Sequence, residues 1–149
     1  IGSMSYAAKT TTNNLAENMG LLTGLRVCLR HYWTPLHVAG DSNIIIRQQR
    51  TRTPPRAQYL HGLFWQSRRI ADKLSVLTWQ HHAREYNKMA DTLTNMAMDS
   101  RHSIQDRPQR VLGSSSRWDD VYAHAHRDVG HWLERNHDKN SSELAAFTR

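Results

Sequence analysis

The sequence predicts an α/β fold over roughly its first two thirds, because short apolar runs alternate there with longer amphipathic segments. Residues 36–40 and 75–81 are rich in strand-forming side chains, and the segments around them repeat apolar residues at helical spacing. Strands that alternate with helices favour a parallel sheet, whose functional side chains gather at the carboxyl ends of the strands. We therefore expect a sheet flanked by helices, with its site at that edge.

The first helix is expected from about Asn14 to Arg30, after a strand candidate at residues 2–9. Its core-facing side is formed by the apolar residues Leu15, Met19, Leu22, Cys28 and Leu29. Asn14 and Glu17 fit a capping box, in which Glu17 also lies at the positive end of the helix dipole. Two interpretations of Glu17 therefore stand: a residue that caps the helix and a residue that takes part in catalysis.

The strand at residues 36–40 ends at Asp41, and Asp41–Ser42 begins a second helix over residues 43–49. A basic linker is expected at Arg47–Arg56, because Pro54–Pro55 stops any helix there. The sequence then predicts a helix, a strand, a loop and a short helix in turn, over residues 58–73, 75–81, 83–87 and 88–97.

The chain changes character after Asp99. Residues 100–116 lack periodicity and contain Pro108 and a Gly-Ser-Ser-Ser run, which indicates a linker. An amphipathic helix is expected from Ser116 to Arg135, and its apolar stripe contains Trp118, Val121, Tyr122, Ala125, Val129, Trp132 and Leu133. Residues 136–149 are expected to be disordered. We therefore divide the chain into a domain over residues 1–99, a linker over 100–116 and a C-terminal extension over 117–149.

Net charge is +7, and only four of the 20 basic residues are lysines. Arginine binds phosphate through two parallel hydrogen bonds and stacks on bases, so this bias favours a nucleic-acid partner; a generally basic soluble domain is the alternative. The sequence contains no run of about 18 apolar residues and no basic-then-apolar leader. We therefore expect an intracellular protein, in the cytoplasm or nucleus, that is monomeric and does not bind a membrane.

Three carboxylates, Glu17, Asp41 and Asp91, are expected at a helix start, a strand end and a helix start. Clustered carboxylates on rigid elements suit hard divalent cations such as Mg²⁺, which take oxygen ligands and keep several waters. Two such ions can activate a water and hold the leaving oxygen during phosphodiester cleavage. We expect the three side chains to converge around a divalent ion.

Three motifs give these acids a context. TTNNLAE, GDS and HHAREYNKMADTL occur in an order and spacing that resembles the ribonuclease H type-1 domain, in its reverse-transcriptase-like branch. The resemblance covers about residues 2–97. It implies a mixed five-stranded sheet flanked by helices, and cleavage of the RNA strand of an RNA–DNA hybrid with two Mg²⁺ ions, Mn²⁺ being an alternative.

The resemblance also implies roles for individual residues. Glu17, Asp41 and Asp91 correspond to metal-binding acids, and His81 to a mobile histidine that helps the attacking water or product exit, a role that His82 contests. Arg84 and Asn87 are expected to shape the loop before Asp91. The residues implied to contact nucleic acid are Asn13, Asn14, Ser42, Asn43, Arg47, Arg50, Arg52 and Arg56. Caps, turns and a solvated basic loop are the alternatives for this set.

The chain departs from the family at its start. The first two strands of the family, and the aspartate on the first of them that bridges both metals, would lie upstream of Ile1. We therefore expect a truncated domain with weak or absent cleavage. Two alternatives stand beside the enzyme: a non-catalytic remnant that binds nucleic acid, and a protein-interaction module that uses the helix from Trp118 to Leu133.

Overall fold

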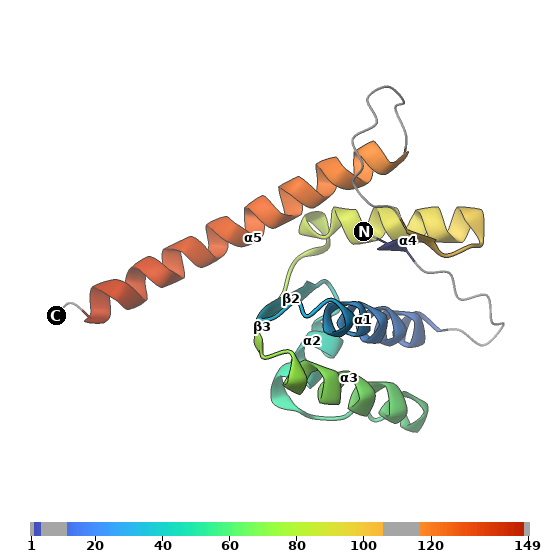
Figure 1. Ribbon diagram of the computed structural model, residues 1–149, viewed down its shortest axis with the longest axis horizontal. Coiled ribbons are helices and arrows are strands. Elements are labelled where there is room, and N and C mark those ends of the chain that lie inside the picture. The colour runs from blue at the N-terminus through green and yellow to red at the C-terminus, as the bar shows by residue number, and fades with distance from the viewer. Residues whose placement is uncertain (1, 4–11, 106–116, 148–149) are drawn as a thin grey trace. The chain divides into compact units, whose positions relative to one another are not determined.

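A computed structural model describes residues 2–3, 12–105 and 117–147 of the chain (Figure 1). The protein has a mixed α/β structure that is mostly helical. It divides into two compact units, which we call the central unit (Tyr6–His82) and the terminal unit (Ile1–Ser5 with Ala83–Arg149). Among the residues that the structure describes, no helix combines the length and the apolar character that a membrane span requires.

The central unit is built around two parallel strands. Its elements are α1 (Asn13–Arg30), β2 (Leu36–Gly40), α2 (Asn43–Thr51), the 3-10 turn η1 (Gln58–Leu60), α3 (His61–Lys73) and β3 (Val76–His81). β2 pairs with β3 in parallel, and Gly40 lies opposite His81 at the carboxyl end of both strands. The predicted alternation of helices and strands is confirmed. The predicted bounds of the strand at residues 36–40 agree with those of β2.

The core of the central unit is formed by side chains from all three helices and from β3. The buried cluster contains Leu25, Ile46, Ala71, Leu74 and Trp79, and Cys28 is among the partly buried residues packed against it. Burial raises the pKa of the Cys28 thiol. Phe64 on α3 is 1% exposed. These contacts fix α1, α2 and α3 around the strands, so the loops at the strand ends have a rigid support.

The cap of α1 differs from the prediction. Thr12 is the N-cap, with extended backbone angles, and its Oγ1 accepts a hydrogen bond of 3.2 Å from the backbone N–H of Leu15. Asn14 is already helical, and its carbonyl oxygen accepts a bond of 2.8 Å from the Asn18 amide. Glu17 lies beyond the first turn. The predicted capping box is therefore wrong, because the hydroxyl of Thr12 does the capping two residues earlier.

The predicted basic linker is also corrected. α2 continues through Thr51, whose hydroxyl donates to the carbonyl oxygen of Arg47 at 2.9 Å. The helix ends where Arg52 adopts a left-handed conformation with φ of 58°, and the N–H of Thr53 bonds to the carbonyl oxygen of Gln48. Arg47–Thr51 is thus helical, and only the residues around Pro54–Pro55 form a loop.

The terminal unit contains two packed helices. Its elements are β1 (Gly2–Ser3), the 3-10 turn η2 (Arg84–Tyr86), α4 (Lys88–Ser100), β4 (Ile104–Gln105) and α5 (Arg117–Phe147). β1 and β4 pair antiparallel. Leu93 and Met96 of α4 form a core with Val121 of α5, and Met89 and Trp118 pack against it. The apolar spacing of Met89, Leu93 and Met96 predicts one core-facing side for this helix, and the core confirms it.

Three predictions for the ends of the chain are corrected in part. The strand candidate at residues 2–9 forms a strand at Gly2–Ser3, and residues 4–9 lie outside the described residues. Ile104–Gln105 is a strand rather than linker, and the rest of the predicted linker from residue 106 is likewise outside. Residues 136–147 are helical, so their predicted disorder is wrong; the segment SSELAAF contains good helix formers.

Candidate nucleic-acid interface and carboxylates

The carboxyl end of the two parallel strands brings Asp41 and His81 together. Asp41 follows β2 directly, and His81 is the last residue of β3. His81 Nε2 donates to the backbone carbonyl oxygen of Asp41 at 3.1 Å, and the N–H of His82 donates to that of Gly40 at 2.9 Å. Both Asp41 and His81 are exposed, whereas His82 is 3% exposed. Of the two histidines, His81 is therefore the one that solvent and a ligand can reach.

The other two predicted acids lie on helices. Glu17 is exposed on α1 of the central unit. Asp91 lies on α4 of the terminal unit, with its side chain 31% exposed, and its Oδ1 accepts a hydrogen bond of 2.8 Å from Arg84 Nη2. The predicted contribution of Arg84 to the loop before Asp91 is thus a direct ion pair. Asn87 occupies the N-cap position of α4, and its carbonyl oxygen accepts from the N–H of Asp91 at 3.2 Å.

The oxygen donors of these acids match the preference of Mg²⁺. Taking the described residues alone, no three His, Cys, Asp or Glu side chains form a group that could hold a metal ion. Glu17 and Asp41 belong to the central unit and Asp91 to the terminal unit, so the predicted convergence of the three stays a prediction.

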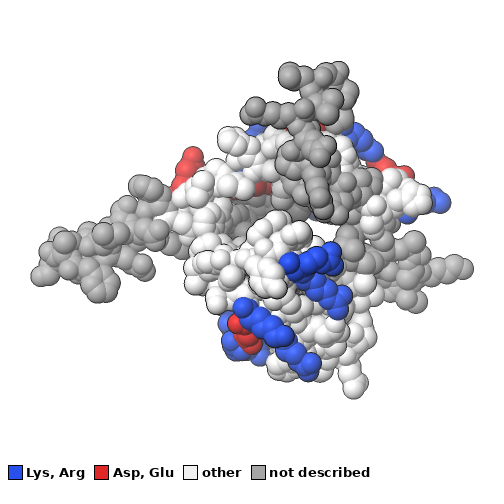
Figure 2. Space-filling view, viewed as in Figure 1, with Lys and Arg blue, Asp and Glu red and all other residues white. Residues whose placement is uncertain are grey.

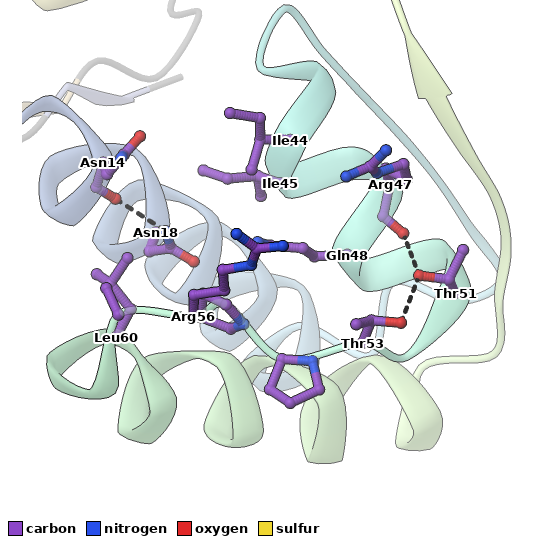
Figure 3. A pocket seen from close by; sticks show the side chains of 13 residues that line it. Asn14, Asn18, Ile44, Ile45, Arg47, Gln48, Thr51, Thr53, Arg56 and Leu60 are labelled. Carbon is purple, nitrogen blue, oxygen red and sulfur yellow. Dashed lines mark hydrogen bonds between the residues drawn. The ribbon is translucent and has the colours of Figure 1, made fainter.

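A pocket of about 600 Å³ lies in the central unit and is lined by residues of α1, of α2 and of the segment that follows α2 (Figure 3). Asn14 of α1 lines it together with Arg47 of α2, and Arg56 extends across it from the loop after α2. Its apolar lining comes from Ile44, Ile45, Pro54, Pro55 and Leu60, and further polar groups come from Asn18 and Gln48. We call these five apolar residues the apolar bed of the pocket. The pocket thus combines this apolar surface with amide and guanidinium groups.

Arg47 and Arg56 keep their charged groups available. Both residues are exposed, and neither side chain has a hydrogen bond or ion pair with any other described residue. A guanidinium group without a protein partner can form two parallel hydrogen bonds with a phosphate. The pocket therefore has the chemistry of an anion-binding rim around an apolar bed.

The remaining predicted contacts lie outside this pocket. Asn13 is the first residue of α1, Ser42 is the N-cap of α2, and Asn43 begins α2. Arg50 is exposed on α2. Sequence reasoning missed Asn18 and Gln48 as lining residues. The spacing of four residues between Asn14 and Asn18 was the available signal, because it places both on one face of a helix.

Arg52 is already paired within the protein. Its guanidinium makes two hydrogen bonds to the carboxylate of Asp72, at 2.7 and 3.2 Å, and buried Arg68 donates to the same carboxylate at 2.7 Å. Arg52, followed by Arg68, holds the pKa of Asp72 below its usual value. Arg68 also lies over the ring of Trp79. This network stabilises the junction of α2 and α3 and competes with any phosphate for Arg52.

The net positive charge of the chain is concentrated in the central unit. Residues 12–82 contain nine Lys or Arg against three Asp or Glu. Figure 2 shows Lys and Arg side chains gathered over α1 and α3 on the face in view, with a small acidic patch among them. Such an excess attracts a polyanion and steers its approach.

A basic α/β protein with an aspartate at a parallel strand end, and arginines beside an apolar pocket, fits the ribonuclease H-like class. Comparison with protein families identifies the chain more closely: residues 1–97 match the family described as reverse transcriptase-like, and the chain belongs to it. This ribonuclease H-like family indicates a function related to nucleic acid.

The chain is also similar to two mycobacterial proteins. They are the bifunctional protein Rv2228c of Mycobacterium tuberculosis and the uncharacterized protein Mb2253c of Mycobacterium bovis. Each is 32% identical over 89 residues, which is 60% of this chain and 24% of the relative. The chain therefore spans about a quarter of the length of these curated relatives.

Proposed function

We propose that this chain binds an RNA–DNA hybrid through its central unit and contributes carboxylates to metal-dependent cleavage of the RNA strand. The observation that carries the proposal is that Asn14 of α1 and Arg47 of α2, both implied to contact nucleic acid, line one pocket. Family membership supports a nucleic-acid ligand. The excess of basic residues in the same unit supports it further.

The pocket suits the chemistry of a hybrid. The Asn14 amide is both a donor and an acceptor, as is the ribose 2′-hydroxyl that distinguishes RNA from DNA. The guanidinium groups of Arg47 and Arg56 can each form two parallel hydrogen bonds with a phosphate on either side of that sugar. The apolar bed that includes Ile44 and Leu60 can contact a sugar or a base face. These groups together favour a nucleotide strand over a simple anion.

We further propose that Glu17, Asp41 and Asp91 bind Mg²⁺ or Mn²⁺. When bound, such ions supply an activated water and stabilise the leaving oxygen. His81 is exposed and bonded to the backbone of Asp41, so it is placed to exchange a proton with water at the edge of the sheet. The support for this step is the order of the motifs and the position of Asp41 and His81 at the strand ends.

A second candidate function is protein interaction through α5. Val129 and Leu133 of α5 are both 55% exposed. Trp118 and Val121, which belong to the same predicted stripe, pack instead against α4. The part of the stripe that is left for a partner is therefore short.

Replacing either pocket arginine by alanine is expected to weaken hybrid binding about tenfold, because each loses a charge-assisted phosphate contact. The slope of log affinity against log salt concentration should fall by about one for each variant. Fluorescence anisotropy with a labelled hybrid over a salt series measures both quantities for Arg47→Ala and Arg56→Ala.

The matched control is Arg69→Ala, which removes the same charge from an exposed position on α3 outside the pocket. It should change affinity by less than about threefold, through net charge alone. Equal losses for all three variants would contradict a specific pocket. A flat salt dependence of the unmodified protein would contradict phosphate binding altogether.

A further inference from the structure

We propose that α5 fixes the position of Asp91, with Asp128 and His131 as positioning residues. The role of Asp91 in cleavage rests on the proposed function, whereas the contacts themselves do not. α5 begins at Arg117, beyond the residues 1–97 that match the family. The helix is thus an addition to the family domain that contacts the segment carrying one of its proposed metal ligands.

The first contact is at the start of α4. Asp128 Oδ2 accepts a hydrogen bond of 2.9 Å from the backbone N–H of Met89, the second residue of α4. The first amides of a helix have no partner within it, and a carboxylate is stabilised by the positive end of the helix. Asn87, the cap residue of α4, makes no side-chain capping bond. A residue of α5 therefore supplies the cap that α4 itself lacks.

The second contact holds the turn before α4. The ring of His131 stacks on that of Tyr86, with centroids 3.5 Å apart and planes inclined by 7°. Tyr86 is the last residue of η2, and Arg84, its first residue, donates to Asp91 at 2.8 Å. The stacking therefore holds the turn that contains Arg84, the ion-pair partner of Asp91, against α5.

The third contact is the hydrophobic core between α4 and α5. Met89 and Leu93, on either side of Asp91 in the sequence, belong to the core that Val121 of α5 completes, and Val121 is fully buried. Asp91 thus lies between two residues that pack towards α5. Together the cap, the ring stack and the core fix the backbone on both sides of Asp91 and the arginine that bonds to its carboxylate.

The test compares Asp128→Ala with Glu134→Ala, which removes an exposed carboxylate from the same helix. Hydrogen exchange followed by NMR on the full chain should show about five- to tenfold faster exchange at Met89 and Asp91 in the first variant only. Amides of the central unit serve as an internal reference. Asp128→Asn keeps an oxygen acceptor and should retain most of the protection, which separates loss of the bond from loss of the fold.

His131 is tested in the same way. His131→Ala should increase exchange at Tyr86, and His131→Phe should restore protection because it retains a flat ring for stacking. Unchanged exchange at Met89 and Asp91 in Asp128→Ala, or at Tyr86 in His131→Ala, would overturn the proposal.

A kinetic measurement separates positioning from simple stabilisation. In a protein that cleaves hybrid, Asp128→Ala should lower kcat and leave KM unchanged, because the proposed hybrid contacts lie in the central unit. Faster exchange with an unchanged kcat would overturn the positioning role. Absence of cleavage in the unmodified protein would contradict the proposed function alone, and the exchange data would still decide whether α5 holds Asp91.

Discussion

Asp41→Asn is expected to reduce Mg²⁺-dependent cleavage of an RNA–DNA hybrid by at least about 100-fold, with hybrid affinity nearly unchanged. Loss of a group that only orients a metal ligand already costs roughly 10–100-fold, so loss of a direct ligand should cost more. Asp41 is exposed at the carboxyl end of β2 and lies outside the arginine-lined pocket. The substitution keeps the size of the side chain and removes the charge that a cation needs.

The measurement uses a longer protein that begins upstream of Ile1, together with the 149-residue chain. Cleavage of a labelled hybrid gives the rate, and anisotropy gives the affinity. Asp120→Asn, at an exposed position of α5, is the matched control and should leave both unchanged. Cleavage retained in Asp41→Asn would remove Asp41 from the site. Binding without any cleavage in the unmodified protein would favour the non-catalytic alternative.

Phe64→Ala is expected to lower the free energy of unfolding of the central unit by about 3–5 kcal/mol, which is typical of a large aromatic residue removed from a core. Phe64 is 1% exposed and is among the largest fully buried side chains. Its loss leaves a cavity that the surrounding helices can fill only in part. Because domains are marginally stable, a cost of this size is a large fraction of the total.

Trp65→Ala is the control, since Trp65 is the next residue along α3 and is 46% exposed. It loses mainly an edge-to-face contact with Phe64, at 5.0 Å between ring centroids, and should cost about 0.5–1.5 kcal/mol. Urea denaturation followed by circular dichroism measures both variants, because tryptophan fluorescence would change with the control itself. Similar costs for the two variants would contradict the assignment of Phe64 to the core.

The parallel strands β2 and β3 were predictable because strong local signals bound them. Leu36–Gly40 lies between Pro35 and Asp41, and no competing pattern occurs in that interval. The first residue of α1 was harder to predict, because Thr12, Asn13 and Asn14 are all good capping residues. Only the backbone conformation, which is extended at Thr12, decides among them.

The site was predictable where regular strand pairing brings residues together, and less so where the packing of distant segments decides. Asp41 and His81 meet because parallel strands end at one edge. The pairing of Arg52 with Asp72, across 20 residues, has no local signal in the sequence. The same holds for Asp128 and Met89, 39 residues apart. Long-range pairs of this kind depend on packing that a single sequence does not display.

If Glu17, Asp41 and Asp91 bind the same divalent ions, as proposed, a Mn²⁺ titration followed by NMR detects the metal at all three residues. Mn²⁺ broadens the signals of nuclei near its binding site. We expect the amide signals of these three residues to broaden together, at the same metal concentration, and we expect Asp41→Asn to weaken the broadening at all three. Broadening at Asp41 that leaves the signals of Glu17 and Asp91 sharp at metal saturation would contradict the claim.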